Sequence, residues 1–536
     1  MTLRRLVAIA VLLIPTLVRA DAPGVYAITG ATVHPVSGPA IPNGIVVIRG
    51  GLIEAVGSGL TIPADATVID ATGSHVYPGL IDAFTSLGFA TPAGGRGGGA
   101  GGGGGAGRAS AERPAEPAPD SLAIRNVKYS EDDADDRRST GVTTVVTAPA
   151  AGIFNGQSVI LNLGNGPAES RAVKSPAALQ ISFNPRPTWT YPDSIMGVVS
   201  YIRQMFFDAQ QHTAASEIYA RSPSGLERPP DNPALEALRP ALRRELPVVF
   251  VADSDNAMRR AAALARELNL RTIIADARQG YDMAPELKNV PVLVSVKWAT
   301  APADKEDREE QPLRVIRERQ LGPTTPAALL KNGVVFALVS GPGKAGDFLP
   351  GIRKAIDNGL SVEDALRATT LWPARIFGID PQLGSLEKGK IANIIVSDKP
   401  LFEKDAKVKR VFVDGREIRL AVPDKKDGEK DATATASAID GTWSITVRAS
   451  QGNVALQMTL RAEDGKISGT FAGDAGAGDI RGGSLDGNGF EVTIAAQSEG
   501  ADASDWLFRG TLDGDAMSGT VTTTLGNFEF SGSRSK

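Results

Sequence analysis

Alternating hydrophobic and polar positions dominate the start of the chain and predict short β-strands. Residues 44–49 and 52–56 alternate in this way on either side of Gly50-Gly51, which indicates a β-hairpin. The neighbouring segments YAITGATVHPV and TVIDATGSHVYPG have the same character. Together they predict a small β domain over residues 21–76.

From about residue 138 to residue 341, apolar runs alternate with helical patterns, including helices from Asp193 towards Ala220 and from Asn256 to Glu267. The apolar runs are GVTTVVTAP, AALQISF, LPVVFVADS, RTIIADA, VPVLVSVKW and VVFALVSG. Such runs, separated by helices, are typical of a parallel sheet that is covered on both faces. The length of the region favours an α/β fold with a closed (β/α)8 TIM-like barrel, which we assign to residues 77–377.

After the barrel the pattern returns to strands. A helix is expected over residues 361–370, opening on a capping box in which Asp364 stands three residues after Ser361. Residues 378–420 then carry strand patterns with Asp-Gly turns. We expect them to join residues 21–76 in one composite β domain, into which the barrel is inserted.

The C-terminal part of the chain forms a separate module. Residues 421–438 have the composition of a linker. Residues 439–536 contain about eight alternating segments and a weak repeat, DGKISGTFAGDAG from Asp464 and DGDAMSGTVTTTLG from Asp513. This pattern predicts an antiparallel all-β barrel or sandwich. Such a module either holds an apolar ligand or has a filled interior.

A glycine-rich segment interrupts the barrel region at residues 91–120. It offers almost no apolar surface to bury, so we predict a disordered insertion. A phosphate-binding loop would need a preceding strand, a following helix and a spaced Lys-Ser/Thr pair, and these are missing.

The first twenty residues have the order of a secretory signal peptide: two arginines, an apolar run from Leu6 to Val18, and Ala20. A membrane anchor would need roughly 20 apolar residues, and Pro15 breaks this run. We therefore expect the mature chain to begin near Asp21 and to be a soluble periplasmic or secreted protein, with no membrane span after cleavage.

Composition excludes several classes of function. The net charge is -4, with no basic excess, so nucleic acid is not an expected partner. The chain contains no cysteine, which rules out disulfides, thiolate metal ligands and a catalytic cysteine.

Several motifs, in their order along the chain, resemble the amidohydrolase superfamily, closest to its imidazolonepropionase-like branch. The resemblance covers roughly residues 25–418. The motifs are ITGATVHPVSG, IRGGLIEAVG, GSHVYPGLIDAF, GVTTVVTAPAAG and SVEDALRATTLWPARIFGIDPQLGSLEKGKIANIIVSDKPL.

The resemblance implies a hydrolase of non-peptide C–N bonds that uses one or two divalent metals such as Zn²⁺. The family's ligands are a His-x-His pair after the first barrel strand, a lysine or glutamate on the fourth, and single histidines on the fifth and sixth. An aspartate after the eighth strand takes a proton from the metal-bound water.

This sequence departs from that pattern at nearly every ligand position. Asp82 matches the aspartate of the family's Pro-Gly-Leu-Ile-Asp phrase, but other residues stand at the metal positions: Phe84 and Ser86 for the His-x-His pair, Gln180 for the lysine, Ala252 and Ala275 for the single histidines, and Ser340, followed by Gly341, for the last aspartate. The three histidines, His34, His75 and His212, fall outside all of these positions. We therefore predict no cofactor and a lost metal site.

Four side chains remain as weak catalytic candidates: Asp82, Asp253, Asp276 and Lys297. The carboxylates would lie near strand ends, where oxygen ligands bind Mg²⁺ or Ca²⁺. The competing interpretation is that Asp82 caps a turn and that Asp253 and Asp276 begin helices. Lys297 is a base if desolvated, or an ordinary solvated lysine. Ser86, Ser254 and Ser340 have no histidine placed to activate them.

Two functions follow from these residues. The chain is either a catalytically degenerate amidohydrolase that serves as a binding or partner subunit, with a small-molecule ligand or an active relative as partner, or a hydrolase with an oxygen-ligand or metal-free site. The metal content of the purified chain distinguishes the two.

Overall fold

The structure is a computed structural model that describes residues 24–89, 118–186, 190–302, 311–342, 345–420, 439–449, 452–463, 466–474, 476–486, 489–496, 504–523 and 526–535. The predictions for residues 1–20 and 421–438, and most of the prediction for residues 91–120, lie outside this part. The chain divides into two compact units, residues 1–420 and 421–536.

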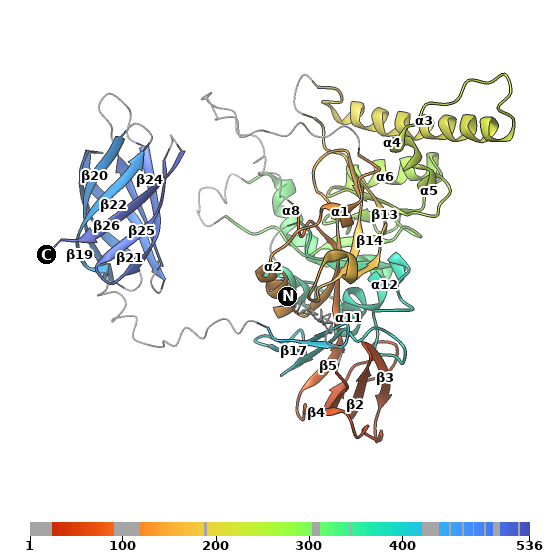
Figure 1. The fold of residues 1–536 in the computed structure, drawn as a ribbon, viewed down its shortest axis with the longest axis horizontal. Coiled ribbons are helices and arrows are strands. Elements are labelled where there is room, and N and C mark those ends of the chain that lie inside the picture. Colours follow the sequence, from red (N-terminus) through yellow and green to blue (C-terminus); the bar gives the residue numbers. More distant parts are fainter. Residues whose placement is uncertain are drawn as a thin grey trace, which may run out of the picture. The chain divides into compact units, whose positions relative to one another are not determined.

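The first unit contains an eight-stranded sheet made from two distant parts of the sequence (Figure 1). Its strands are β1 (Tyr26–Val33), β2 (Ile41–Arg49), β3 (Leu52–Gly57), β4 (Thr67–Asp70), β5 (His75–Pro78), β16 (Ile394–Ser397), β17 (Val408–Val413) and β18 (Arg416–Ile418). The order is β18-β17-β16-β5-β1-β2-β3, with β4 beside β1. The predicted hairpin is confirmed, because β2 pairs with β3 across Gly50 and Gly51, both at positive φ.

Seven parallel strands form the barrel region: β6 (Leu80–Thr85), β7 (Val142–Thr147), β11 (Leu179–Ser182), β12 (Val248–Val251), β13 (Thr272–Ala275), β14 (Val292–Ser295) and β15 (Phe336–Val339). β6 pairs with β7, and β11 to β15 pair in sequence order. Because a parallel strand pair needs a crossover connection, this arrangement follows from the alternation of strands and helices in the sequence.

One barrel position is antiparallel, which the sequence pattern did not predict. β8 (Phe154–Gln157) pairs antiparallel with β11, and β9 (Val159–Asn162) pairs antiparallel with β7 and with the short β10 (Ala172–Lys174). The chain returns from β7 through β8 to β9 without a helix, and so short a connection permits only antiparallel pairing of β9 with β7.

Helices surround these strands: α1 (Ala123–Asn126), α2 (Glu131–Ser139), α3 (Ile195–Arg221), α4 (Pro233–Glu236), α5 (Arg239–Leu242), α6 (Asp255–Glu267), α8 (Leu313–Leu321), α9 (Thr325–Lys331), α10 (Phe348–Asp357), α11 (Val362–Thr369) and α12 (Leu371–Phe377), with short 3-10 turns η1 (Ala168–Arg171), η2 (Gly322–Thr324) and η3 (Ala345–Asp347). Ser361 caps α11 by accepting from the backbone N–H of Asp364. Within the described ranges, no helix is both long and apolar enough to cross a membrane.

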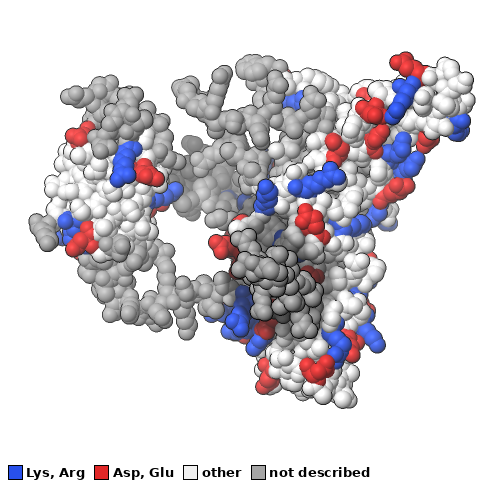
Figure 2. Space-filling view, viewed as in Figure 1, with Lys and Arg blue, Asp and Glu red and all other residues white. Residues whose placement is uncertain are grey.

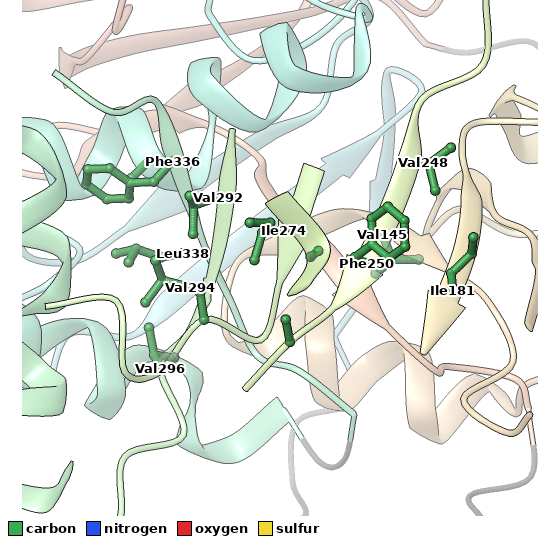
Figure 3. Packing of buried hydrophobic residues seen from close by; sticks show 14 of the residues in the cluster. Val145, Ile181, Val248, Phe250, Ile274, Val292, Val294, Val296, Phe336 and Leu338 are labelled. Carbon is green, nitrogen blue, oxygen red and sulfur yellow. The ribbon is translucent and has the colours of Figure 1, made fainter. Parts of the chain in front are cut away.

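The barrel strands bury apolar side chains on both faces. Val248 and Phe250 of β12 belong to the large cluster that also includes residues of the surrounding helices, whereas Val249 belongs to a second cluster with Ile81 and Leu293. Figure 3 shows side chains of the larger cluster on neighbouring strands. Burial on both faces is the physical reason that these strands are continuous Val/Ile runs in the sequence.

The second unit is a closed antiparallel barrel of consecutive strands: β19 (Gly441–Ala449), β20 (Gly452–Glu463), β21 (Lys466–Gly473), β22 (Gly476–Asp486), β23 (Gly489–Ala496), β24 (Ser504–Asp513), β25 (Ala516–Thr523) and β26 (Gly526–Arg534). Large apolar side chains, among them Trp443, Phe508 and Phe530, are buried in one cluster. The predicted barrel is thus confirmed, and this cluster favours a filled interior over a ligand cavity.

The weak repeat corresponds to β21 and β25. Both strands have a Ser-Gly-Thr centre, at Gly469 and Gly519. A Cβ added at Gly469 would lie 1.9 Å from the carbonyl oxygen of Thr459, and one at Gly519 would lie 2.1 Å from that of Arg509. Both copies of the repeat therefore contain a glycine because the neighbouring backbones approach too closely for any other residue.

Candidate functional site

A cavity of about 350 Å³ lies at the carboxyl ends of the barrel strands. Residues at the ends of β6, β11 and β12, and residues that follow β7 and β13, line it. Barrel enzymes place their chemistry at this end because the loops that leave the strands converge there. The cavity is therefore the candidate functional site of the first unit.

The structure brings several of the predicted metal positions together in this cavity. Phe84, Ser86 and Gln180 all line it. Ala252 and Ala275 are buried at the ends of their strands, and the residues after them, Asp253 and Asp276, line the cavity instead. Ser340 is not a lining residue. Three of the six predicted metal positions thus line a cavity whose other side chains are apolar, hydroxyl, amide and carboxylate groups.

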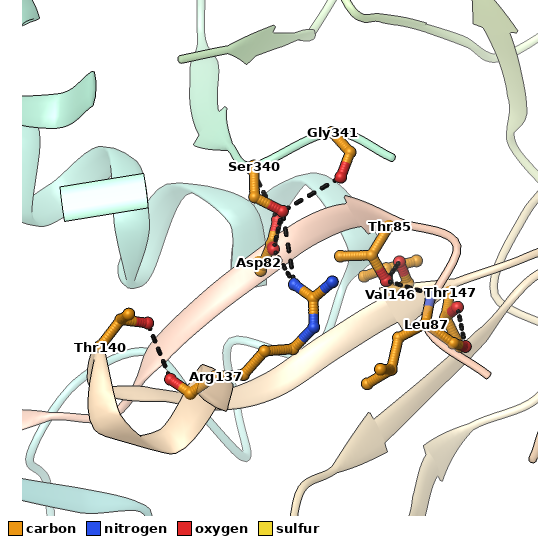
Figure 4. A network of polar contacts seen from close by, with 9 residues as sticks. All are labelled: Asp82, Thr85, Leu87, Arg137, Thr140, Val146, Thr147, Ser340 and Gly341. Carbon is orange, nitrogen blue, oxygen red and sulfur yellow. Dashed lines mark hydrogen bonds and ion pairs between the residues drawn. The ribbon is translucent and has the colours of Figure 1, made fainter. Parts of the chain in front are cut away.

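Asp82 has a different place and is fully buried on β6 (Figure 4). Arg137 of α2 donates from Nη1 to its Oδ2 at 2.9 Å, and the backbone N–H of Ser340 donates to its Oδ1 at 3.0 Å. The Ser340 hydroxyl donates to Oδ2 as well. Burial raises the pKa of Asp82, while the Arg137 charge and the Ser340 hydrogen bonds act to lower it. This carboxylate connects β6, α2 and the end of β15.

Asp276 is a cavity-lining carboxylate with a raised pKa. Burial raises its pKa to about 6; the Arg278 charge opposes this rise and Asp253 adds to it. The Arg278 guanidinium lies 3.5 Å from Asp276 Oδ1 and 3.4 Å from Asp253 Oδ2. Asp276 itself has a positive φ of 61°. A carboxylate with a pKa near neutrality is suited to proton transfer.

The expectation that Asp253 and Asp276 begin helices is wrong. The N-cap residue of α6 is Ser254, one position beyond Asp253. Asp276 follows β13 in the left-handed region, where the chain bends without starting a helix. Aspartate tolerates this conformation better than most residues, so its position after the strand has a backbone explanation.

Two polar side chains of the cavity, Asn155 and Ser182, were missed by the sequence reasoning; they line it together with the predicted position Gln180. Ser182 donates from its hydroxyl to Asn155 Oδ1 at 2.9 Å, and Asn155 Nδ2 donates to the carbonyl of Ala151. Gln180 is 3% exposed, and its Oε1 has no hydrogen-bond partner within the described part of the chain. The alternation of side chains along β11 would have indicated that Gln180 and Ser182 share one face.

Lys297 and the histidines lie away from the cavity. Lys297 is exposed beyond β14 and is not a lining residue. His34 and His75 meet in the eight-stranded sheet, where His34 Nε2 and His75 Nδ1 are 3.1 Å apart. Burial, with a smaller effect of His75, lowers the pKa of His34 to about 4. His212 lies in α3, near the carbonyl of Pro230.

The donor set does not fit the metal centre that the resemblance implies. Among the residues that the structure describes, no group of three or more His, Cys, Asp or Glu side chains is placed to hold a metal ion. Asp253 and Asp276 are the carboxylates at the cavity, and both face the Arg278 guanidinium. A nearby guanidinium opposes cation binding because it already supplies the compensating charge.

Comparisons with known proteins show what the chain is similar to. Residues 315–418 match the model of the amidohydrolase family. The fold is similar to the crystal structure of an amidohydrolase from Thermotoga maritima MSB8, with a TM-score of 0.61 and 23% identity, over 74% of this chain and 99% of that one. A prolidase complexed with N-methylphosphonate-L-proline has a TM-score of 0.47 and 20% identity, over 74% of this chain and 99% of the prolidase.

A short segment also matches a curated protein. Over 37 residues the chain is 54% identical to N-acetylglucosamine-6-phosphate deacetylase of Haemophilus influenzae, which is 7% of this chain and 10% of the deacetylase. The match thus spans a tenth of the length of that relative. Together with the family model and the shared fold, it confirms the resemblance to amidohydrolases. The assignment to the imidazolonepropionase-like branch stays a prediction.

Proposed function

We propose that this chain is a catalytically degenerate amidohydrolase that binds a small molecule in the strand-end cavity and uses no metal. The observation that carries the proposal is the identity of the lining residues: Phe84, Ser86 and Gln180 stand where the family's first ligands would be. Asp82, which matches the family phrase, is already bonded to Arg137 and Ser340. The volume of about 350 Å³ suits a small ligand.

The lining residues also support a ligand class. Phe84, Phe183 and Val251 provide apolar contact, and the unpartnered Gln180 Oε1 requires an N–H or O–H donor. A buried acceptor without a partner costs about 1–3 kcal/mol, which a ligand donor would recover. We therefore propose a small amide or amine with an apolar side group as the ligand.

Metal content and ligand binding test this proposal on the purified mature chain. After exposure to Zn²⁺, Mn²⁺ and Mg²⁺ followed by dialysis, elemental analysis should find far less than one metal per chain. A thermal-shift screen of small amides and amines should identify compounds that raise the melting temperature, because a ligand that binds the folded state stabilises it. Such compounds should not be hydrolysed.

A substitution at Gln180 tests whether the ligand binds in the strand-end cavity. Gln180→Met should abolish the thermal shift, whereas Gln210→Met, at an exposed position of α3, should leave it unchanged. Stoichiometric metal, together with hydrolysis that a chelator removes, would refute the proposal.

The raised pKa of Asp276 favours a second function, metal-free hydrolysis with Asp276 as general base. At neutral pH this carboxylate is mostly ionised, and an acceptor with a pKa near the working pH takes a proton efficiently. If this function is correct, a bound amide will be cleaved at a rate that rises with pH through about 6. Asp276→Asn would then abolish cleavage and retain binding, and Asp231→Asn, at an exposed position outside the cavity, would retain both.

We also propose that the chain is exported, on the evidence of the apolar run from Leu6 to Val18 behind two arginines. N-terminal sequencing of the protein recovered from the periplasm or medium should begin near Asp21. Retention in the cytoplasm with Met1 intact would contradict export. An active amidohydrolase of the same compartment is the proposed partner, and it should copurify with the tagged chain.

A further inference from the structure

A second and larger cavity lies at the opposite end of the barrel strands. It is an open groove of about 1260 Å³, lined by Arg271 and Thr272 at the start of β13 and by Val290 and Pro291 before β14. The strand-end cavity, by contrast, is lined by Asp276 beyond the end of β13. The two cavities are therefore at different ends of the same strands.

The groove has a strong excess of positive charge. Its lining contains one carboxylate, Glu286, and six cationic side chains: Arg244, Arg259, Arg266, Arg271, Lys288 and Arg375. Glu286 is paired with Arg259 at 3.1 Å. This excess contrasts with the net charge of -4 for the whole chain. Over the face drawn in Figure 2, acidic and basic side chains of the first unit are interspersed.

The other five cations have no carboxylate within 4.0 Å in the part of the chain that the structure describes. Arg244 bonds the carbonyl and side-chain oxygens of Asn269, and Arg271 bonds the carbonyl of Ile376 at 3.4 Å. These bonds orient the guanidinium groups without neutralising them. A concave surface lined by one sign of charge concentrates the field and attracts ligands of opposite charge.

An apolar strip accompanies the cations. Leu270, Val290, Val335 and Trp372 line the groove, and Val335 is 49% exposed. Trp372 is half-buried, and its ring meets Phe336 edge-on at 5.1 Å. Arginine and tryptophan are the residue types that dominate binding energy at protein interfaces. A ligand that fits this lining has negative charges flanking an apolar group.

We propose that the groove binds an acidic peptide segment of a partner protein, with its carboxylates on the arginines and an apolar side chain against Trp372. The volume exceeds that of a usual small-molecule pocket, which is about 300–1,000 Å³, so an extended segment fits better than a metabolite. A nucleic acid is less suited, because a domain that binds it carries a net basic charge. This inference does not depend on the strand-end cavity.

A labelled peptide tests the proposal on the full chain. The probe is fluorescein-labelled Glu-Glu-Leu-Glu-Glu-Phe-Glu-Glu, and its counterpart has glutamine in place of every glutamate. Fluorescence anisotropy should show that the glutamate peptide binds and the glutamine peptide does not. Added salt should weaken binding, because the charges are exposed and screened.

Double arginine substitutions test whether the peptide binds in the groove. The double variant Arg266→Gln/Arg375→Gln should weaken binding by about fivefold to tenfold or more. Arg448→Gln/Arg461→Gln removes the same charge from exposed positions of the second unit and should leave affinity unchanged. Equal losses in both double variants would overturn the proposal, since binding would then follow net charge alone.

Three further outcomes would overturn the proposal. Absence of binding up to about 1 mM peptide at low salt would remove the acidic peptide as occupant. A heparin hexasaccharide that binds while the peptide does not would assign the groove to an anionic glycan. Concentration-dependent self-association that disappears in Arg266→Gln/Arg375→Gln, with no peptide binding, would assign it to a second copy of this chain.

Discussion

Phe84 and Gln180 show how single residues define the candidate site. The resemblance to amidohydrolases predicts a histidine and a lysine at these positions, and here an aromatic ring and a neutral amide line one cavity. Phe84 is 8% exposed and belongs to an apolar cluster. Gln180 offers an acceptor that the described residues leave unpartnered. The two residues therefore favour an apolar ligand with a polar group over a metal ion.

Removal of the buried amide of Gln180 should make the folded chain more stable. Gln180→Met retains the length of the side chain and removes the unpartnered Oε1, so the free energy of unfolding should rise by about 1 kcal/mol. Urea denaturation of the ligand-free chain measures this change. The exposed control Gln210→Met should change stability by less than about 0.5 kcal/mol. A destabilised Gln180→Met variant would show that the amide has a partner in the folded chain.

The raised pKa of Asp276 predicts that the free energy of unfolding falls as the pH rises. Its pKa is raised from 3.8 to about 6 by burial, so the folded state holds this proton more tightly than the unfolded state. The resulting stabilisation is complete below about pH 3.8 and is lost as the pH rises through about 6.

Asp276→Asn should remove this pH-dependent loss of stability, because asparagine is neutral at every pH. Asparagine also accepts the positive φ of 61° at this position. At pH 7 the variant should be more stable than the parent by roughly 1–3 kcal/mol, and the difference should fall towards zero near pH 4. Urea unfolding at several pH values measures it. Asp231→Asn is the matched control, since the Asp231 side chain is 82% exposed and is not among the groups that shift the pKa of Asp276. A constant difference across this pH range would contradict the assignment.

At the scale of elements, the side chain of Asp82 on β6 links that strand to the end of β15. The sheets that contain these strands are separate, and Ser340, immediately after β15, donates its backbone N–H to Asp82 on β6. Arg137 of α2 completes the contact with 4% of its side chain exposed. A carboxylate with these bonds is a structural link between three elements, which explains why it is not available at the cavity.

Breaking this buried ion pair should be costly. Asp82→Ala should lower the free energy of unfolding by about 3–5 kcal/mol, because Arg137 would remain buried without its partner. The double variant Asp82→Ala/Arg137→Met should lose less than the sum of the two single losses. Asp282→Ala, in an exposed pair with Arg317, should cost less than about 1 kcal/mol. Equal effects of Asp82→Ala and Asp282→Ala in chemical denaturation would rule out the proposed link.

At the scale of the whole molecule, the two units are predicted to unfold independently. Each has its own apolar cores, and the cluster of the second unit contains residues of that unit alone. Calorimetry of the full chain should therefore show two transitions. Fragments ending at residue 420 and beginning at residue 439 should each reproduce one of them. A single transition, or a fragment that does not fold, would show that the units depend on each other.

Much of the fold could be predicted from local pattern. The β2–β3 hairpin, the helices α3 and α6, and the eight strands of the C-terminal barrel all follow from the spacing of apolar residues. The antiparallel direction of β8 and β9 could not be predicted, because a short apolar segment fits a parallel or an antiparallel strand equally well. Only the absence of a crossover connection decides the direction. For the site, strand ends indicated Gln180, Asp253 and Asp276, whereas Asn155 carries no signal in a single sequence.

The sequence by itself determined the class of fold, the presence of Phe84 and Ser86 where the resemblance predicts histidines, and the absence of cysteine chemistry. These properties depend on residue identity and on spacing over a few positions, which the chain carries before it folds. Only the tertiary structure decided the partners of Asp82, which lie 55 and 258 residues away, and the gathering of cations in the basic groove. Contacts at such separations depend on how strands and helices pack, and the sequence pattern does not specify that packing locally.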